Sequence, residues 1–178
     1  MKIIKVNLFP LLIVLTRILF GIGWLLAGIT KITEKLWFKE PGIFLREYLL
    51  HSLQKTNVPP FYKIFIENIA LEHVLVFNYV IPIVQIILGL FLIAGLFTIP
   101  SILVCLFMHI NFILSGNMNL ISLILYTNGF LLIIFRKTSY YFSLDKYFNR
   151  INPSTLNIKN IETSFSLNSK KERLFNNS

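Results

Sequence analysis

Residues 79–114 read YVIPIVQIILGLFLIAGLFTIPSILVCLFMHINFIL, a stretch without a single Asp, Glu, Lys or Arg. A helix needs about 20 mostly apolar residues to cross a bilayer, so this stretch is long enough for two crossings. Between them, Pro100 stands where a new helix can begin. The sequence therefore predicts two spans, 79–97 and 99–115, which must be antiparallel neighbours because the connection between them is so short.

Two further apolar segments flank this pair, at 11–31 and 119–136. The whole chain is 55% apolar and only 14% charged, with a mean hydropathy of +0.69. A water-soluble core of 178 residues could not hide that much apolar surface. We predict an all-α integral membrane protein, in which residues 1–150 form a four-helix bundle.

A long connection, residues 33–78, separates the first two predicted spans. It carries charges of both signs and a break at Pro59-Pro60. Apolar residues recur at helical spacing on both sides of that break, which predicts one or two short amphipathic helices in an extracytoplasmic loop. A plain cap packed over the bundle is the simpler interpretation of these helices, and a lipid-sensing element is the alternative.

The net charge of +9 reflects topology, because the basic residues flank apolar runs or lie in the last part of the chain. Nothing in this pattern calls for nucleic acid as a partner. Lys2 and Lys5 precede the first span and Arg136 and Lys137 follow the fourth, so the positive-inside rule places both termini in the cytoplasm of a multi-pass cell-membrane protein. Residues 151–178 are rich in Asn, Ser and Lys, which predicts a flexible basic cytoplasmic tail.

Several kinds of chemistry are excluded by the residue inventory. Cys105 is the single cysteine, so a disulfide within the chain and a cysteine-rich metal site are both impossible. The four predicted spans contain no carboxylate, which argues against proton pumping through buried acids. No metal-binding or phosphate-binding motif is present. His109 lacks a facing partner for haem ligation, so the sequence identifies no metal or bound cofactor.

Polar residues inside the predicted spans are few, and each is costly in lipid unless it finds a partner or lines a wet cavity. In the predicted topology most of them fall in the outer half of the membrane, which suggests a polar pocket roofed by the long loop. Arg17, deeper in the first span, either snorkels to the headgroups or pairs inside the bundle. The alternative to a pocket is that these polar residues form hydrogen bonds between the helices and have only a structural role. The candidate residues are Arg17, Trp24, Lys31, Gln85, His109, Asn111, Ser115 and Asn128.

Three glycines lie on helix faces that would approach a neighbouring helix. Gly21 and Gly28 are seven residues apart in the first span, and Gly89 shares a face with Gln85 in the second. Small residues let helix backbones pack closely within a membrane. We therefore assign Gly21, Gly28 and Gly89 to helix packing.

Four segments of the chain resemble the DoxX/DoxD family of small four-helix membrane proteins. Arg17 through Lys31 is similar to the first-helix signature of that family, 81–96 to its second helix, 111–116 to the end of its third, and 143–146 to the Leu-Asp-Arg-like element after the fourth. In this chain Gln85 stands where the resemblance leads us to expect Glu. If that acid takes part in proton-coupled redox chemistry elsewhere in the family, this chain lacks the group.

The resemblance implies a membrane location and an association with redox systems, since some members resemble the small subunit of a thiosulfate:quinone oxidoreductase. The first hypothesis is accordingly a membrane subunit of a quinone-linked redox system, with a quinone as ligand and a second oxidoreductase subunit as partner beside the bilayer. The second hypothesis is a non-catalytic membrane anchor or stabilising partner of another protein. The third is a small transporter.

Overall fold

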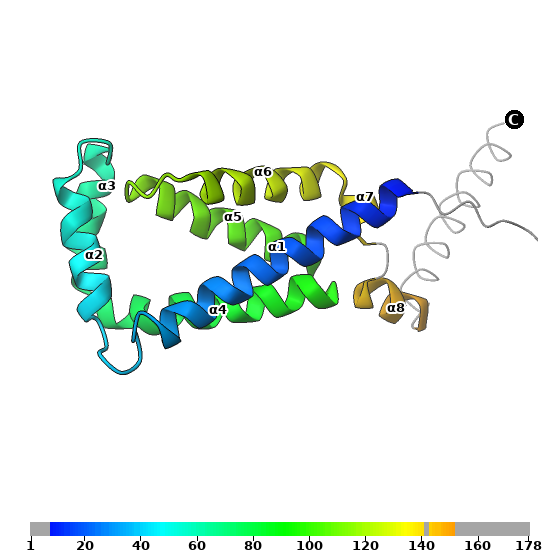
Figure 1. Cartoon of the computed structure of the whole chain (residues 1–178), viewed down its shortest axis with the longest axis horizontal. Helices are drawn as coiled ribbons and strands as arrows, with labels where there is room; N and C mark the ends of the chain where they lie inside the picture. The colour runs from blue at the N-terminus through cyan, green and yellow to red at the C-terminus, as the bar shows by residue number, and fades with distance from the viewer. Residues whose placement is uncertain (1–7, 141–142, 152–178) are drawn as a thin grey trace, which may run out of the picture.

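The computed structural model describes residues 8–140 and 143–151, and within these ranges the protein is all-helical, with no strand. Four long helices provide most of the described structure (Figure 1). They are α1 (Leu8–Thr33), α4 (Val74–Ala94), α5 (Thr98–Leu114) and α6 (Leu120–Ile134). The predicted tail, residues 151–178, lies outside the described residues except for Ile151.

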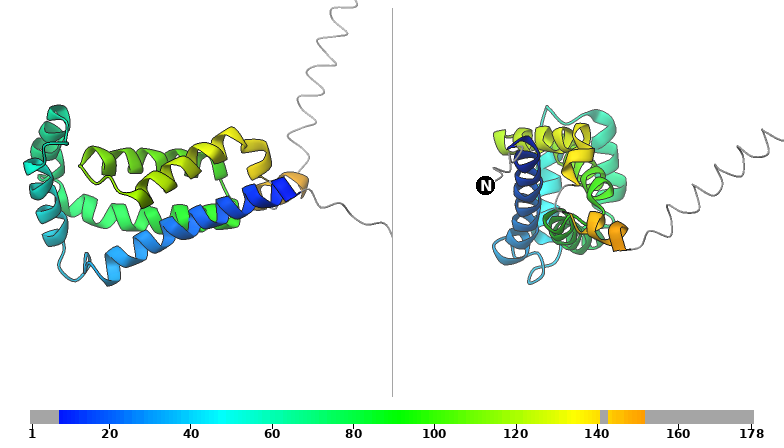
Figure 2. Two further views of the ribbon diagram at one scale, coloured as in Figure 1. Left: turned by 45° about the horizontal axis from the view of Figure 1, so that its top comes forward. Right: turned by 90° about the vertical axis from the view of Figure 1, so that its right-hand side faces the viewer.

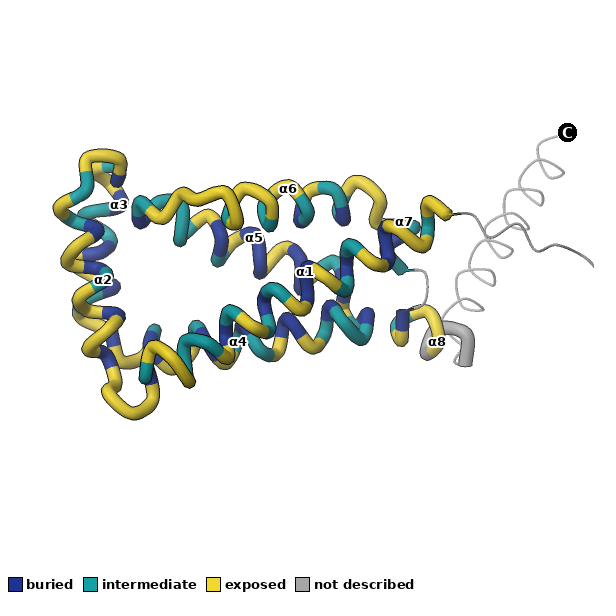
Figure 3. The backbone as a smooth tube through the Cα atoms, in the orientation of Figure 1, coloured by how far each residue is buried: buried dark blue, intermediate teal, exposed yellow. Residues whose placement is uncertain are grey.

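The four long helices pack side by side, with α1 against α4 and α6, and α5 against α4 and α6 (Figures 1 and 2). By length and composition, α1 and α4 could each cross a membrane, whereas α5 and α6 are apolar but shorter. Their shared core includes Phe20, Trp24, Leu92 and Ile102. Figure 3 shows buried residues facing inward along these helices and exposed residues on the outside.

The outer faces of the long helices are apolar. Leu19 on α1 is 56% exposed, Phe107 on α5 is 67% exposed and Ile121 on α6 is 69% exposed. Monomeric soluble proteins rarely leave large contiguous apolar patches in contact with water. The surface of these four helices therefore suits an apolar surrounding.

Among the described helices, α1 and α4 make the most extensive contact, and their backbones approach closely. A Cβ atom placed on Gly89 would lie 2.6 Å from the backbone nitrogen of Leu25, and one on Gly21 would lie 2.9 Å from the carbonyl oxygen of Gly89. A Cβ on Gly28 would lie 2.8 Å from the carbonyl oxygen of Pro82. The three glycines assigned to packing thus lie where the two backbones touch.

Residues 34–73, between α1 and α4, are largely helical and lie across one end of the four long helices (Figures 1 and 2). We call this segment the cap. It contains α2 (Ile43–Gln54), α3 (Pro60–Phe65) and the π-helical turn η1 (Ile66–Ala70). The cap has its own buried cluster around Trp37, Leu49 and Ile66.

Hydrogen bonds attach the cap to α4 and to the turn between α5 and α6. Asn78 on α4 is fully buried, and its Nδ2 donates to the carbonyl oxygen of Trp37 at 2.7 Å. At the turn between α5 and α6, Gly116 adopts a φ of 78°, and Lys55 Nζ donates to its carbonyl oxygen at 3.3 Å. The polar tip of the α5–α6 hairpin is therefore covered by the cap.

The opposite end of the protein holds the start of α1 together with α7 (Arg136–Ser139) and α8 (Leu144–Ile151) (Figure 1). The described chain thus begins and ends at the end remote from the cap. Gly95, with a φ of 71°, ends α4 there and touches Ser143 at the start of α8.

Substitution of Gly89 by Ala should separate α1 from α4. The added methyl group meets backbone atoms, which cannot rotate away as a side chain can, so we expect a loss of about 2 kcal/mol or more and a lower midpoint of thermal unfolding in detergent. Gly23→Ala is the matched control on α1, because its Cβ would meet only a terminal methyl group of Leu125 at 3.3 Å. Equal midpoints for the two variants would contradict the assigned packing.

Candidate functional site

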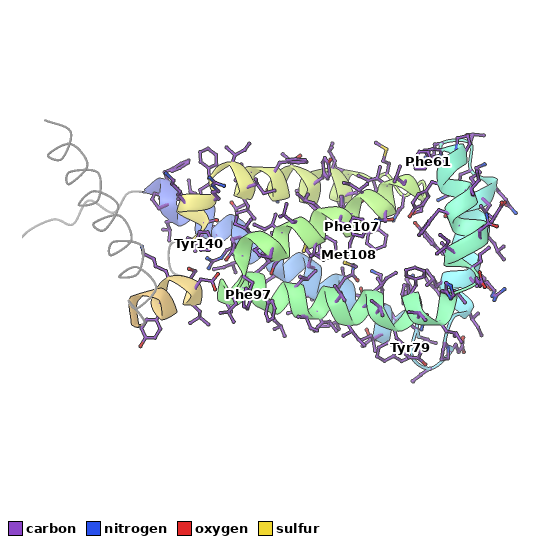
Figure 4. The ribbon with its side chains drawn as sticks, turned by 180° about the vertical axis from the view of Figure 1, so that it is seen from behind. Phe61, Tyr79, Phe97, Phe107, Met108 and Tyr140 are labelled. Atoms are coloured by element: carbon purple, nitrogen blue, oxygen red, sulfur yellow. The ribbon has the colours of Figure 1, made fainter. Side chains whose placement is uncertain are left out.

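A cavity of about 330 Å³ lies between α4 and α5, under the cap. In Figures 1 and 4, α4 and α5 diverge from their connection toward the cap, and Phe107 and Met108 of α5 lie in the space between them. The wall is mostly aliphatic and aromatic. Its residues are Leu45, Tyr48, Leu49, Tyr62, Phe65, Ala70, Phe77, Val80, Ile81, Val84, Val104, Phe107, Met108, Asn111, Phe112 and Ser115.

The cavity has one polar edge, where the cap meets the end of α5. Tyr62 Oη donates to both the carbonyl oxygen and the side-chain Oδ1 of Asn111, each at 3.1 Å. Tyr48 Oη lies 2.5 Å from Ser115 Oγ. These four residues, Tyr48, Tyr62, Asn111 and Ser115, therefore hold the cap on α5 and also supply the polar groups of the cavity wall. We call them the polar edge.

Both tyrosines of the polar edge remain protonated over the physiological range. Burial raises the pKa of Tyr62 to about 12, and the nearby Tyr48 adds to the shift. Burial also raises the pKa of Tyr48, partly offset by its hydrogen bond with Ser115. The two phenols act as neutral hydrogen-bonding groups and not as acids near neutral pH.

The cavity opens sideways between α4 and α5. Three of its wall residues are also exposed on the outer surface: Val80 is 47% exposed, Val104 41% and Phe107 67%. An apolar molecule can therefore reach the cavity from the side of the helices, along the same face that carries the exposed apolar residues.

Two of the candidate residues from the sequence, Asn111 and Ser115, lie together in the cavity wall. His109 lies elsewhere, on a different side of α5. Its Nε2 is 2.7 Å from the carbonyl oxygen of Ser122, and its ring stacks on Tyr126 with centroids 5.8 Å apart. His109 thus joins α5 to α6, away from the cavity.

Trp24 and Gln85 lie inside the protein. The Trp24 ring contacts His109 edge-to-face, with centroids 6.3 Å apart. Within the described part of the chain, Trp24 Nε1 and Gln85 Oε1 are buried without a hydrogen-bond partner. Neither residue lines the cavity.

Lys31 and Asn128 are both half-buried and lie outside the cavity wall. Lys31 Nζ donates to the carbonyl oxygen of Ala27 at 3.2 Å and lies over the Phe112 ring, 5.4 Å from its centroid. Phe112 also lines the cavity, so Lys31 lies next to the cavity but is not part of the cavity wall. Asn128 lies on α6 and is not among the residues that line the cavity.

Arg17 belongs to the opposite end of the protein. Its side chain is 1% exposed, and Nη1 donates to the carbonyl oxygen of Ser139 at 2.6 Å. Of the two alternatives from the sequence, pairing inside the helical bundle describes this geometry and snorkelling does not. Arg17 fixes α7 to α1 and is remote from the cavity under the cap.

The two tyrosines of the polar edge were not candidates from the sequence. Tyr48 and Tyr62 lie in the cap, where helical spacing with apolar neighbours indicates packing and carries no sign of a hydrogen-bonding role. An available signal is that each falls on the apolar face of its helix, beside Leu49 and Phe65, so that its hydroxyl must find a partner inside the protein.

No protein-family model, curated protein or solved structure matches this chain. In the described ranges, no group of three His, Cys, Asp or Glu side chains is placed to hold a metal ion. The inference about function therefore depends on the cavity and its polar edge.

Loss of the Tyr62 hydroxyl should weaken the attachment of the cap. We expect Tyr62→Phe to lower stability by about 1 kcal/mol, the usual net value of a neutral hydrogen bond. Tyr79→Phe is the control, because Tyr79 on α4 is 40% exposed and does not line the cavity. If both substitutions have the same effect on thermal unfolding, the Tyr62–Asn111 contact does not stabilise the protein.

The raised pKa of Tyr62 also predicts a pH effect. The neutral phenol is favoured in the folded state, so its contribution is fully present below pH about 10 and is lost as pH rises from about 10 to about 12. Stability measured across this interval should fall less steeply for Tyr62→Phe than for the wild type. Parallel pH profiles would contradict the assignment.

Proposed function

We propose that the chain is an integral membrane four-helix protein of the DoxX-like type, in which α1, α4, α5 and α6 cross the bilayer. The apolar outer faces of all four helices support this proposal. The described chain begins and ends at one end of the helices, with basic Arg136 and Lys137 exposed there. By the positive-inside rule this end is cytoplasmic and the cap is outside.

The short helices α5 and α6 are compatible with this placement. With 17 and 15 residues they are about 26 and 23 Å long, less than the roughly 30 Å of a hydrocarbon core. The turn between them is covered by Lys55, Asn57 and Val58 of the cap. Its backbone polar groups thus meet protein where they would otherwise meet lipid.

We further propose that the protein binds a lipophilic molecule, such as a quinone, in the cavity between α4 and α5, as a membrane subunit of a redox system. The observation that carries this proposal is the combination of an apolar wall, a lateral opening and a single polar edge. Such a site accepts an apolar ring or tail and orients one polar head. The second oxidoreductase subunit is part of the same proposal.

The topology can be tested with single cysteines in a Cys105→Ser background. Lys39 in the cap and Lys137 in α7 are both exposed. A membrane-impermeant maleimide added to intact cells should label Lys39→Cys at once and Lys137→Cys only after permeabilisation. The reverse labelling pattern would invert the orientation, and equal labelling of both sites in intact cells would refute the membrane placement.

Ligand binding can be tested by filling the cavity. Val104→Trp places a large ring in the cavity wall. Leu103→Trp, at the preceding position of α5, adds the same ring outside the cavity. With protein in lipid nanodiscs, we expect a short-tailed benzoquinone to bind the wild type and Leu103→Trp. Its affinity for Val104→Trp should be at least tenfold lower. Empty nanodiscs correct for partition into lipid.

Two results would favour the alternatives. If the quinone does not bind the wild type above empty nanodiscs, the ligand-binding proposal fails. Capture of a stoichiometric non-redox partner in mild detergent would then support a membrane anchor. Substrate uptake into proteoliposomes above empty vesicles would support a transporter.

A further inference from the structure

We propose that the cavity selects lipophilic molecules that carry a hydroxyl group, because its polar edge offers phenol oxygens as acceptors for that group. A phenol or a reduced, quinol-type head would therefore bind better than the matching ether or oxidised quinone. This inference rests on the proposed ligand-binding function and specifies the chemical class of the ligand.

The direction of the Tyr48–Ser115 hydrogen bond follows from the neighbouring contacts. Ser115 Oγ donates its one hydrogen to the carbonyl oxygen of Phe112 at 2.8 Å. It can then only accept from Tyr48, whose Oη lies 2.5 Å away. The Tyr48 hydrogen is therefore committed to Ser115, and its oxygen keeps the capacity to accept a hydrogen bond.

Tyr62 is committed in the same way. Both partners of its hydroxyl, the carbonyl oxygen and Oδ1 of Asn111, are pure acceptors, so Tyr62 must be the donor. Its oxygen also keeps its accepting capacity. Asn111 Nδ2 donates one hydrogen to the carbonyl oxygen of Phe107 at 2.8 Å, and its second hydrogen can be donated to a ligand.

The polar edge therefore presents more acceptors than donors: the two phenol oxygens and the remaining lone pairs of Asn111 Oδ1 and Ser115 Oγ can accept, and one hydrogen of Asn111 Nδ2 can be donated. A hydroxyl group can donate to a tyrosine oxygen and accept from Asn111 at once. A quinone carbonyl or an ether oxygen can only accept, so it can use Asn111 but leaves the tyrosine oxygens unmatched. To use a tyrosine as a donor, it must break one of the contacts that hold the cap.

The apolar wall adds little to this selection. In a bilayer the lateral opening admits lipid chains, and these are as apolar as any ligand tail. A ligand that displaces a lipid chain gains little from the wall, so the polar edge determines which head is preferred.

The test compares 4-nonylphenol, 4-nonylanisole and 2-nonyl-1,4-benzoquinone, which share one tail and differ in the head. Binding is measured by equilibrium dialysis with the full chain in nanodiscs, each value corrected for partition into empty nanodiscs. One net hydrogen bond is worth roughly fivefold in affinity. We expect nonylphenol to bind the wild type about fivefold or more tightly than the other two.

Three variants assign the preference to the tyrosine oxygens. Tyr48→Phe/Ser115→Ala and Tyr62→Phe/Asn111→Leu each remove one phenol oxygen together with the side-chain oxygen that the loss of its donor would free. Each double variant should therefore reduce the ratio of nonylphenol affinity to nonylanisole affinity. Tyr79→Phe, outside the cavity, should keep the wild-type preference. If one of the double variants does not fold, which thermal unfolding identifies, the other provides the test.

The outcomes separate this inference from the proposed function. Equal binding of the three probes to the wild type would overturn the hydroxyl preference and leave ligand binding intact. A preference that is unchanged in both double variants would also overturn it, because the acceptors would then lie elsewhere. Binding of none of the probes above empty nanodiscs would refute the ligand-binding function itself.

Discussion

The backbone contact between α1 and α4 is the constraint on which the rest of the structure depends. Gly21, Gly28 and Gly89 allow the two longest helices to touch without intervening side chains. Lipid tails are as apolar as a leucine, so close packing replaces the hydrophobic effect as the force that joins helices in a membrane. α1 and α4 thereby form a rigid pair, and the other helices must fit against it.

Within the α5–α6 hairpin, α5 lies closest to α4 near the short connection between them (Figure 1). Near its start α5 is tied to α4 by the short connection at Gly95, and along its length it is joined to α6 through His109 and Ser122. His109 therefore serves the structural role that the sequence left open as an alternative. Toward the cap α5 diverges from α4, and this divergence creates the cavity (Figure 4). The cap covers the open end, so cavity and cap are consequences of the same geometry.

The sequence predicted the all-helical fold because long apolar runs and their breaks are local features. It placed a helix at 79–97, whereas α4 begins at Val74 and ends at Ala94, because Gly95 takes a left-handed conformation that stops the helix. The chain from 33 to 78 was predicted as a loop with short helices, and α2, α3 and η1 lie within it. Their position across the end of the bundle depends on contacts between distant residues, such as Asn78 with Trp37, which no local pattern reveals.

The candidate site was predicted from the depth of each residue in the membrane. The position of a helical residue also depends on the direction in which it points around the helix axis. His109 and Asn111 lie at nearly the same level, but two residues correspond to about 200° around a helix. They therefore point to different neighbours, α6 and the cap. Asn111 and Ser115, one turn apart, share a face and do lie together in the cavity wall. Arg17 lies one turn before Gly21 on the same face of α1, and its side chain contacts Ser139 of α7, away from the cavity.

The polar edge gives two tasks to the same hydroxyl groups. Tyr48 and Tyr62 use their hydrogens to hold the cap and have only their oxygens left for a ligand. A ligand that accepts from them competes with the cap, and one that donates to them leaves the cap in place. Donation to a phenol oxygen also polarises its O–H group and strengthens the bond that this group makes. On the proposed function, a hydroxyl-bearing ligand would therefore leave the hydrogen bonds between the cap and α5 in place, whereas an accepting ligand would compete with them.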